Sequence, residues 1–316
     1  MELYIEKEFA ENFWIEYNPE KGTEIQRIIY SIFSEFANVK WFLNCSDESI
    51  KENELLYKLS DINLNFESEV DFNKLFSDNF IPKKQTLVLT GEVRDWFPIL
   101  KEKGVLCFSY DTYEKELKYF IETTKTVVEL DNPENIPINW ELFRFLRNER
   151  KFIIISDPYI LTDSIGQEIR NNLIQLLKIN LSKEHFYSIF IITEVDNNID
   201  KKLLLLYSAL KDYKVKLYVF NRLRKIENMR MHGRILYSNF TFTKSGIGFN
   251  LNIKKIVNEE VIVDTMFDKR IYRRMNEHFR LFIDYIEKLE KLELGKQHQY
   301  TTNSSKSYEI FREILS

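Results

Sequence analysis

The sequence of 316 residues holds only eight glycines, six prolines and two cysteines. Glycine and proline are far below their usual shares of about 7% and 5%, which excludes collagen-like, glycine-rich linker and proline-rich chains. The two cysteines have no metal-ligand spacing and are too few for a disulfide framework, as is typical of a cytoplasmic protein. No apolar run reaches the roughly 18 residues of a membrane-spanning helix. The opening MELYIEKEFAENF carries acids where a signal peptide has basic residues, so no leader is predicted.

The composition that remains is that of a globular protein. Hydrophobic residues make up 44% and charged residues 30% of the chain, which is enough for a core and argues against disorder. The length favours two domains. Residues 1–140 hold 15 Lys and Arg against 27 Asp and Glu, a net charge of −12, whereas residues 141–316 hold 30 against 22, a net charge of +8. Either the second half faces an anionic partner, or the two halves neutralise each other.

Short apolar runs alternate with helical patterns, which predicts an α/β fold. In the first half, the runs at residues 3–5, 39–43, 86–90, 105–108 and 127–130 predict the strands of a Rossmann-like parallel sheet in an acidic domain, residues 1–135. Turn residues at 131–137 mark the boundary. Residues 140–294 predict a basic α/β domain that closes on a periodic helix at 275–292. Residues 295–316 predict a polar tail with a short terminal helix.

One stretch carries a chemical pattern. It begins His232-Gly-Arg234, reaches Asn239 five residues after Arg234, and continues to Gly246-Ile-Gly248-Phe-Asn250. It resembles the motif H-x-K-x4-D-x6-G-S-x-N of the phospholipase-D-like superfamily. Arg234 stands for the lysine and Asn239 for the aspartate, the serine position holds an isoleucine, and Asn250 comes one residue late.

A second landmark agrees with the first. The run FIIISDPYIL, with Asp157 and Tyr159, resembles the opening strand of that superfamily's domain. The ordered pair is most similar to the C-terminal phospholipase-D-like domain of the MIT-domain proteins of cell abscission and related bacterial domains. The resemblance covers roughly residues 145–285 and implies a phospholipase-D-like α/β fold there. It does not extend to the acidic half.

The resemblance implies phosphodiester chemistry that needs no metal and no cofactor. In the superfamily a histidine attacks phosphorus, a second histidine protonates the leaving oxygen, and lysine and asparagine hold the phosphoryl oxygens. His232, Arg234 and Asn250 are the corresponding residues, with Asp157, Tyr159 and Asn239 in support. The chain has one such motif, so activity would need a homodimer. The alternatives for His232 are a structural residue at a strand end and membrane binding, which the resemblance also implies.

Basic residues surround the motif and could form an anion track for a nucleic-acid backbone or anionic lipid headgroups. The phosphate-binding candidates are Arg222, Arg224, Lys225, Arg230, Lys244, Gly246, Gly248, Arg273 and Arg274. The alternative is a solvated face paired with nearby acids. The interleaved Tyr218, Tyr237, Phe240 and Phe242 could stack on bases or belong to the core.

The acidic half offers a different chemistry. Glu6, Glu35, Asp95 and Asp111 lie near predicted strand ends and could assemble a metal-dependent nuclease site of PIN-like type, or form a solvated acidic surface.

The sequence therefore predicts a protein that binds phosphodiesters, chiefly nucleic acid, through a degenerate phospholipase-D-like site. The resemblance adds an accessory or effector role in a bacterial anti-phage or mobile-element system. The alternatives are a homodimeric metal-independent nuclease, a peripheral binder of anionic membranes, and a protein–protein adaptor.

Overall fold

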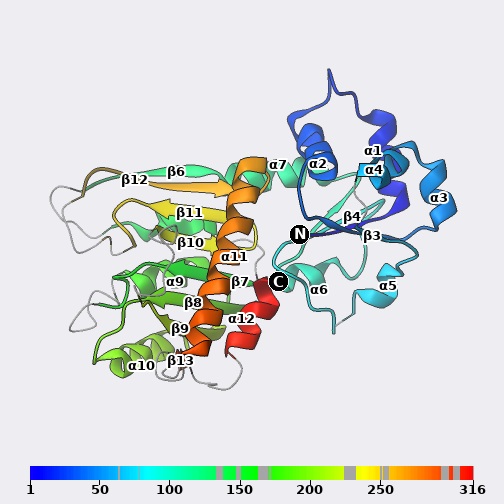
Figure 1. Cartoon of the computed structure of the whole chain (residues 1–316). Coiled ribbons are helices and arrows are strands. Elements are labelled where there is room, and N and C mark those ends of the chain that lie inside the picture. The colour runs from blue at the N-terminus through cyan, green and yellow to red at the C-terminus, as the bar shows by residue number, and fades with distance from the viewer. Residues whose placement is uncertain are drawn as a thin grey trace. The chain divides into compact units, whose positions relative to one another are not determined.

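The computed structural model (Figure 1) forms two compact units, each built on one β-sheet. The first unit comprises residues 1–123 and 266–273, and the second comprises residues 124–265 and 274–316. Both sheets contain parallel strands and are accompanied by helices, so the predicted α/β class is confirmed. The structure describes residues 1–62, 65–77, 79–132, 138–146, 151–162, 170, 172–223, 233–249, 251, 256–292, 299–301 and 307–315.

The sheet of the first unit has five strands, all parallel, in the order β3-β2-β1-β4-β5. Its strands are β1 (Glu2–Ile5), β2 (Lys40–Leu43), β3 (Phe66–Glu67), β4 (Thr86–Thr90) and β5 (Leu106–Ser109). The interior strand β4, between β1 and β5, is buried along its whole length, which explains its apolar run. The parallel sheet predicted for the first half is present.

Helices connect these strands, and one more helix follows the last strand, β5. They are α1 (Lys7–Glu16), α2 (Glu24–Ser34), α3 (Asp47–Glu52), α4 (Glu54–Ile62), α5 (Phe72–Leu75), α6 (Phe97–Glu102) and α7 (Tyr113–Thr124). Helix α2 begins at a capping box: the Thr23 hydroxyl accepts from the Gln26 amide, and the Gln26 side chain accepts from the Thr23 amide.

The sheet of the second unit has eight strands in the order β13-β9-β8-β7-β10-β11-β12-β6. They are β6 (Thr126–Asn132), β7 (Phe152–Ser156), β8 (Phe186–Thr193), β9 (Lys214–Asn221), β10 (Arg234–Ser238), β11 (Thr241–Ser245), β12 (Ile256–Thr265) and β13 (Gln299–Thr301). Strands β7, β8 and β9 are parallel, and every other pairing is antiparallel.

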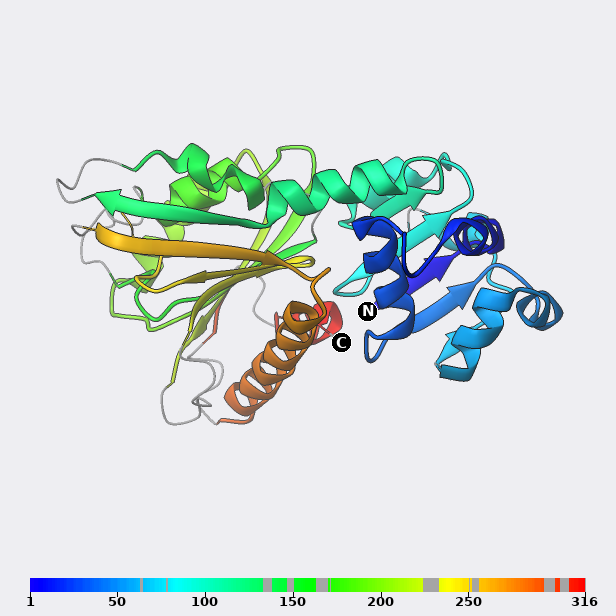
Figure 2. The same ribbon diagram turned by 90° about the horizontal axis from the view of Figure 1, so that it is seen from above.

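Helices cover both faces of this sheet (Figure 2). The 3-10 helix η1 (Trp140–Leu146) and helices α9 (Leu173–Asn180) and α10 (Ile199–Leu210) share one core with Ile153 and Ile155 of β7. The intervening side chains of β7 face the opposite way, because side chains alternate along a strand. There Phe152 contacts Phe279 of α11 (Lys269–Lys291), and α12 (Ser307–Leu315) places Phe311 against β8 and β9.

The structure places one predicted element differently. The strand predicted at residues 127–130 exists as β6, but it pairs with β12 in the second sheet instead of ending the first. The two strands are more than 120 residues apart in sequence, and no local pattern signals such a pairing. Residues 133–137 of the predicted boundary lie outside the described residues.

The terminal elements agree with the sequence. The predicted periodic helix is present as α11, whose Phe279, Phe282, Ile286 and Leu289 are buried, and the short terminal helix is α12. None of the described helices combines the length and apolarity that crossing a lipid bilayer requires.

Candidate functional site

Several predicted residues meet at one edge of the second sheet. The parallel strands β7, β8 and β9 end there at Ser156, Thr193 and Asn221. Ser156 pairs with Ile235, the second residue of β10, so β10 begins at this same edge. Arg234, its first residue, pairs with Ser245 at the end of β11. Ligands of open α/β sheets bind at the carboxyl ends of the parallel strands, so this edge, called here the β7 edge, is a natural ligand position.

The side chain of Arg234 is the cation at the centre of the β7 edge. Its Nη1 donates to the carbonyl oxygen of Gly246 at 3.0 Å, and its Cζ lies 5.5 Å from the centre of the Tyr159 ring. Arg234 is half-buried, and its guanidinium is held by two contacts, one with a carbonyl and one with an aromatic ring. A planar guanidinium fixed in this way can donate the rest of its fork to a phosphate.

The carboxylate of Asp157 organises the turn beneath Arg234. It is 1% exposed, and its two oxygens accept from two backbone amides, that of Tyr159 at 2.9 Å and that of Phe249 at 3.1 Å. One side chain therefore joins the loop after β7 to the glycine-containing turn after β11. Asp157 is a positioning residue, since both of its oxygens already serve the backbone.

Gly248 is the point of closest approach in that turn. Its φ is +85°, a conformation that favours glycine, and a Cβ there would stand 2.6 Å from Asp157 Oδ2 and 3.0 Å from Arg234 Cδ. The Ser245 hydroxyl donates to the Gly248 carbonyl at 2.6 Å. Gly246 has no such constraint, since a Cβ there would meet only the end of Glu259, at 3.2 Å.

Hydrogen bonds from the end of β8 hold the loop that carries Tyr159. The Pro158 carbonyl accepts from the Thr193 hydroxyl and the Glu194 amide, both at 3.1 Å. Farther along, the Leu161 carbonyl accepts at 2.6 Å from the ammonium of Lys202, which is 3% exposed and also paired with Asp196.

Arg222 joins the same edge, two strands away from Asp157. Its amide donates to the Thr193 carbonyl at 2.7 Å, and the residue is buried. Two acids also lie here. The Glu259 carboxylate, one of the acids that could pair with the basic residues, lies near Gly246. Glu194, which the sequence pattern did not single out, follows the end of β8.

Other predicted residues lie elsewhere. Asn239, at the far end of β10 from Arg234, is fully buried and accepts the amides of Lys151 and Phe152 at 2.8 and 3.3 Å. It fixes the start of β7 and does not orient a group at the β7 edge. Lys244 pairs with Ile235 and so faces the side of the sheet opposite to Arg234.

Arg274 of α11 is also separate from Arg234. Arg274 lies over the Phe242 ring at 5.6 Å, and Phe242 pairs with Tyr237 near the far end of β10. Arg273 belongs to the first unit. Five further predicted residues lie outside the described residues: His232, Asn250, Arg224, Lys225 and Arg230.

All four aromatic residues that could stack on bases in the sequence analysis belong to the core. Tyr218, Tyr237, Phe240 and Phe242 are each at most 3% exposed. Tyr237 is hydrogen-bonded to Nδ1 of His278, and burial raises the pKa of this tyrosine well above its usual range.

His278 is the partner of Tyr237 on α11. Burial is the largest cause that lowers its pKa below the ordinary value of 6.5, and the positive charge of Arg274 lowers the pKa further, while Glu277 opposes the shift. The segment His278-Phe279-Arg280 has the same H-x-R spacing as His232-Gly-Arg234. It lies on α11, where His278 is held against the core, and it makes no second motif.

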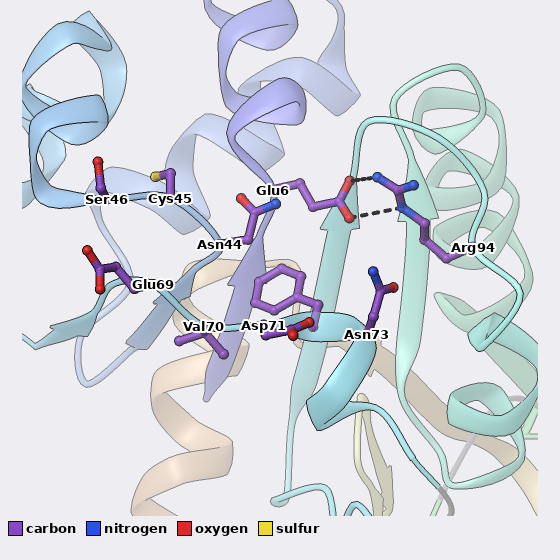
Figure 3. Close-up of a pocket in the computed structure, with 10 residues that line it drawn as sticks. Glu6, Asn44, Cys45, Ser46, Glu69, Val70, Asp71, Asn73 and Arg94 are labelled. Atoms are coloured by element: carbon purple, nitrogen blue, oxygen red, sulfur yellow. Dashed lines mark hydrogen bonds and ion pairs between the residues drawn. The ribbon is translucent and has the colours of Figure 1, made fainter.

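The first unit carries a separate cleft of about 490 Å³ (Figure 3). It lies at the carboxyl ends of β1 and β2, beside the loop after β4, where the strand order changes direction. Its lining residues are Glu6, Asn44, Cys45, Ser46, Glu69, Val70, Asp71, Phe72, Asn73 and Arg94.

A buried ion pair forms one wall of this cleft. Glu6 is 4% exposed, and its carboxylate accepts from Arg94 Nε at 3.0 Å, from Arg94 Nη2 at 2.8 Å and from the Gly91 amide at 2.9 Å. The third nitrogen of Arg94 donates to Glu92 at 2.7 Å. The only cation of the lining is therefore already neutralised, while Glu69 and Asp71 add negative charge, and the cleft disfavours phosphate.

The metal site considered for the acidic half is not assembled. Of its four acids only Glu6 lines the cleft, and Glu35 is paired with Lys269 at 2.9 Å. Asp95 and Asp111 are exposed. Among the described residues no group of three or more acids, histidines or cysteines could hold a metal ion.

Comparison with known proteins identifies no family for this chain. No protein-family model and no curated protein matches the chain. Eight chains of solved structures match, one of them TrmBL2, an archaeal chromatin protein whose structure shows a novel mode of DNA binding. That match has 13% identity and a TM-score of 0.29, and covers 61% of this chain and 66% of TrmBL2, just under two thirds. A TM-score this low carries no conclusion about fold or function.

Proposed function

We propose that the second unit is a phospholipase-D-like domain with a degenerate site and that it binds the phosphodiester backbone of nucleic acid at the β7 edge. The observation that carries the proposal is the arrangement of Arg234, whose guanidinium is fixed between the Gly246 carbonyl and the Tyr159 ring. The first unit is, in this proposal, a Rossmann-like domain without a phosphate site. The proposal includes the accessory or effector role in a bacterial anti-phage or mobile-element system that the resemblance implies.

The charges of the two sheets support placing the anion at the β7 edge. In the first unit, Glu6 and Glu92 use the donors of Arg94, so a phosphate would meet carboxylates. At the β7 edge, Gly246 uses one of Arg234's nitrogens through a neutral carbonyl, which leaves the positive charge uncompensated by that contact.

The test is binding of labelled DNA and RNA oligonucleotides to the full chain by fluorescence anisotropy, in EDTA, at several salt concentrations. Arg234→Gln should weaken binding across sequences and lower the slope of log K against log salt by about one. The control is Arg144→Gln, because Arg144 is an exposed arginine paired with Glu141 in η1. Equal binding by wild type and Arg234→Gln would refute the proposal.

The same reactions separate the alternatives. Cleavage in EDTA that His232→Ala abolishes would identify a metal-independent nuclease, and the mass in the same buffer should then be that of a dimer. Binding to anionic vesicles, with none to oligonucleotides, would identify a peripheral membrane protein. Absence of both would leave an adaptor.

A further inference from the structure

We infer that the nucleic acid taken at the β7 edge is single-stranded and that one of its bases stacks on the ring of Tyr159. This inference rests on the proposed function and names the substrate class of that site. Of the described aromatic side chains in the second unit, only Tyr159 (43%) and Phe186 (69%) are exposed to solvent. Tyr159 is the one at the β7 edge, whereas Phe186 begins β8 at the opposite edge.

The ring of Tyr159 is presented by a rigid backbone. Its amide donates to the buried Asp157, and its carbonyl accepts the amide of Thr162 at 3.2 Å and the Thr162 hydroxyl at 2.9 Å. The neighbouring Pro158 carbonyl is held by β8. A tyrosine has few rotatable bonds, so a ring on such a backbone can contact a base with little loss of conformational freedom.

The contact between Tyr159 and Arg234 joins two kinds of recognition. The guanidinium lies 5.5 Å from the ring centre, so a phosphate on Arg234 and a base on Tyr159 can belong to neighbouring parts of one strand. Proteins that bind single strands combine these two elements, a cation for the backbone and an aromatic face for the base.

A duplex fits the described edge poorly. Its base faces are covered by their neighbours in the stack and cannot reach Tyr159, so a duplex would depend on phosphate contacts alone. The acids Glu194 and Glu259 lie at the same edge as Arg234 and oppose a continuous row of phosphates. Stacking adds binding free energy that only an unpaired strand can use.

The experiment compares the full chain's affinity for a fluorescein-labelled oligothymidylate of about twelve nucleotides with its affinity for the same strand in a duplex, by anisotropy in EDTA. The wild type should bind the single strand more tightly. Tyr159→Ala should weaken single-strand binding roughly 5- to 150-fold, the factor that loss of one stacked base gives, and should weaken duplex binding by a smaller factor, because a duplex loses only the ring contact that holds Arg234. Tyr159→Phe keeps the ring and should restore the affinity.

Phe186→Ala is the matched control. Phe186 is also exposed and has a cation above its ring, the Lys214 ammonium at 5.0 Å, but it lies at the opposite edge of the sheet, so its loss should leave both affinities unchanged. Unchanged single-strand affinity in Tyr159→Ala, or duplex binding as tight as single-strand binding in the wild type, would overturn the inference while the phosphodiester proposal stands. Failure of the wild type to bind either probe would overturn both.

Discussion

Replacing Gly248 by alanine tests the architecture of the β7 edge. A Cβ on this residue would lie 2.6 Å from Asp157 Oδ2, far inside contact distance. The carboxylate cannot simply swing away, since it is buried and both of its oxygens accept backbone amides. The residue also has a φ of +85°, which costs a non-glycine residue about 1–2 kcal/mol.

The two effects add, because one acts on the backbone and the other on the neighbour. Weakening one hydrogen bond to a charged group costs about 1.5–3 kcal/mol. We therefore expect Gly248→Ala to lower the free energy of unfolding of the second unit by about 2.5–5 kcal/mol. For a unit of this size, that corresponds to a fall of about 5–20 °C in the Tm.

The assay is thermal and urea unfolding of the full chain by far-ultraviolet circular dichroism, with hydrogen exchange of residues 151–162 and 241–249 to locate the effect. Gly233→Ala is the matched control. Gly233 lies beside the same site without a positive φ, and a Cβ there would meet only Ile235 at an ordinary 3.6 Å. The reasoning is refuted if Gly248→Ala unfolds within about 0.5 kcal/mol of Gly233→Ala.

For three further substitutions the structure determines the direction of the change in stability. Arg94→Leu should lower the stability of the first unit by about 3 kcal/mol in urea unfolding, because it strands the buried Glu6 carboxylate, and adding Glu6→Gln should recover part of the loss. Lys202→Met should cost about 1–3 kcal/mol and speed exchange in the segment after β7, because the Leu161 carbonyl loses its donor. Burial keeps the folded pKa of His278 below 6.5, so the unfolded chain binds more protons and stability should fall as the pH drops below about 6.5. His278→Gln should make that fall smaller between about pH 7 and pH 5.5, as measured by urea midpoints.

Local pattern was sufficient for most of the fold. The runs that became β4 and β7 are apolar without alternation, because each strand is buried on both faces, and the sequence shows this directly. Strand partners were not predictable in the same way. The assignment of β6 to the second sheet depends on its pairing with β12, a contact between distant parts of the chain.

The site residues show the same difference between local patterns, which the sequence reveals, and distant contacts, which it does not. Asp157, Tyr159, Arg234, Gly246 and Gly248 were all singled out from two short motifs, and they do meet, because each lies at a strand end on the β7 edge.

The spacing of the motif groups Asn239 with the site residues, but the structure places it at the other end of β10. Five residues of β10 separate it from the edge, and its amide oxygen is needed by the start of β7. The ion pair of Glu6 and Arg94 was equally hidden, since 88 residues separate its members.

The dispersal of the basic residues decides what kind of nucleic-acid binding to expect. A continuous track would give a steep dependence on salt, with a slope near −0.7 per phosphate contact for a single strand. Yet Lys244 faces the other side of the sheet, and Arg274 lies toward the far end of β10. Among the described residues, the β7 edge keeps Arg234 and Arg222 as its cations. Binding there should thus have a shallow slope, near −0.7 to −1.4, and take the rest of its free energy from stacking. A slope of −3 or steeper for the wild type would mean that the basic residues act together, and would contradict a site centred on Arg234 and Tyr159.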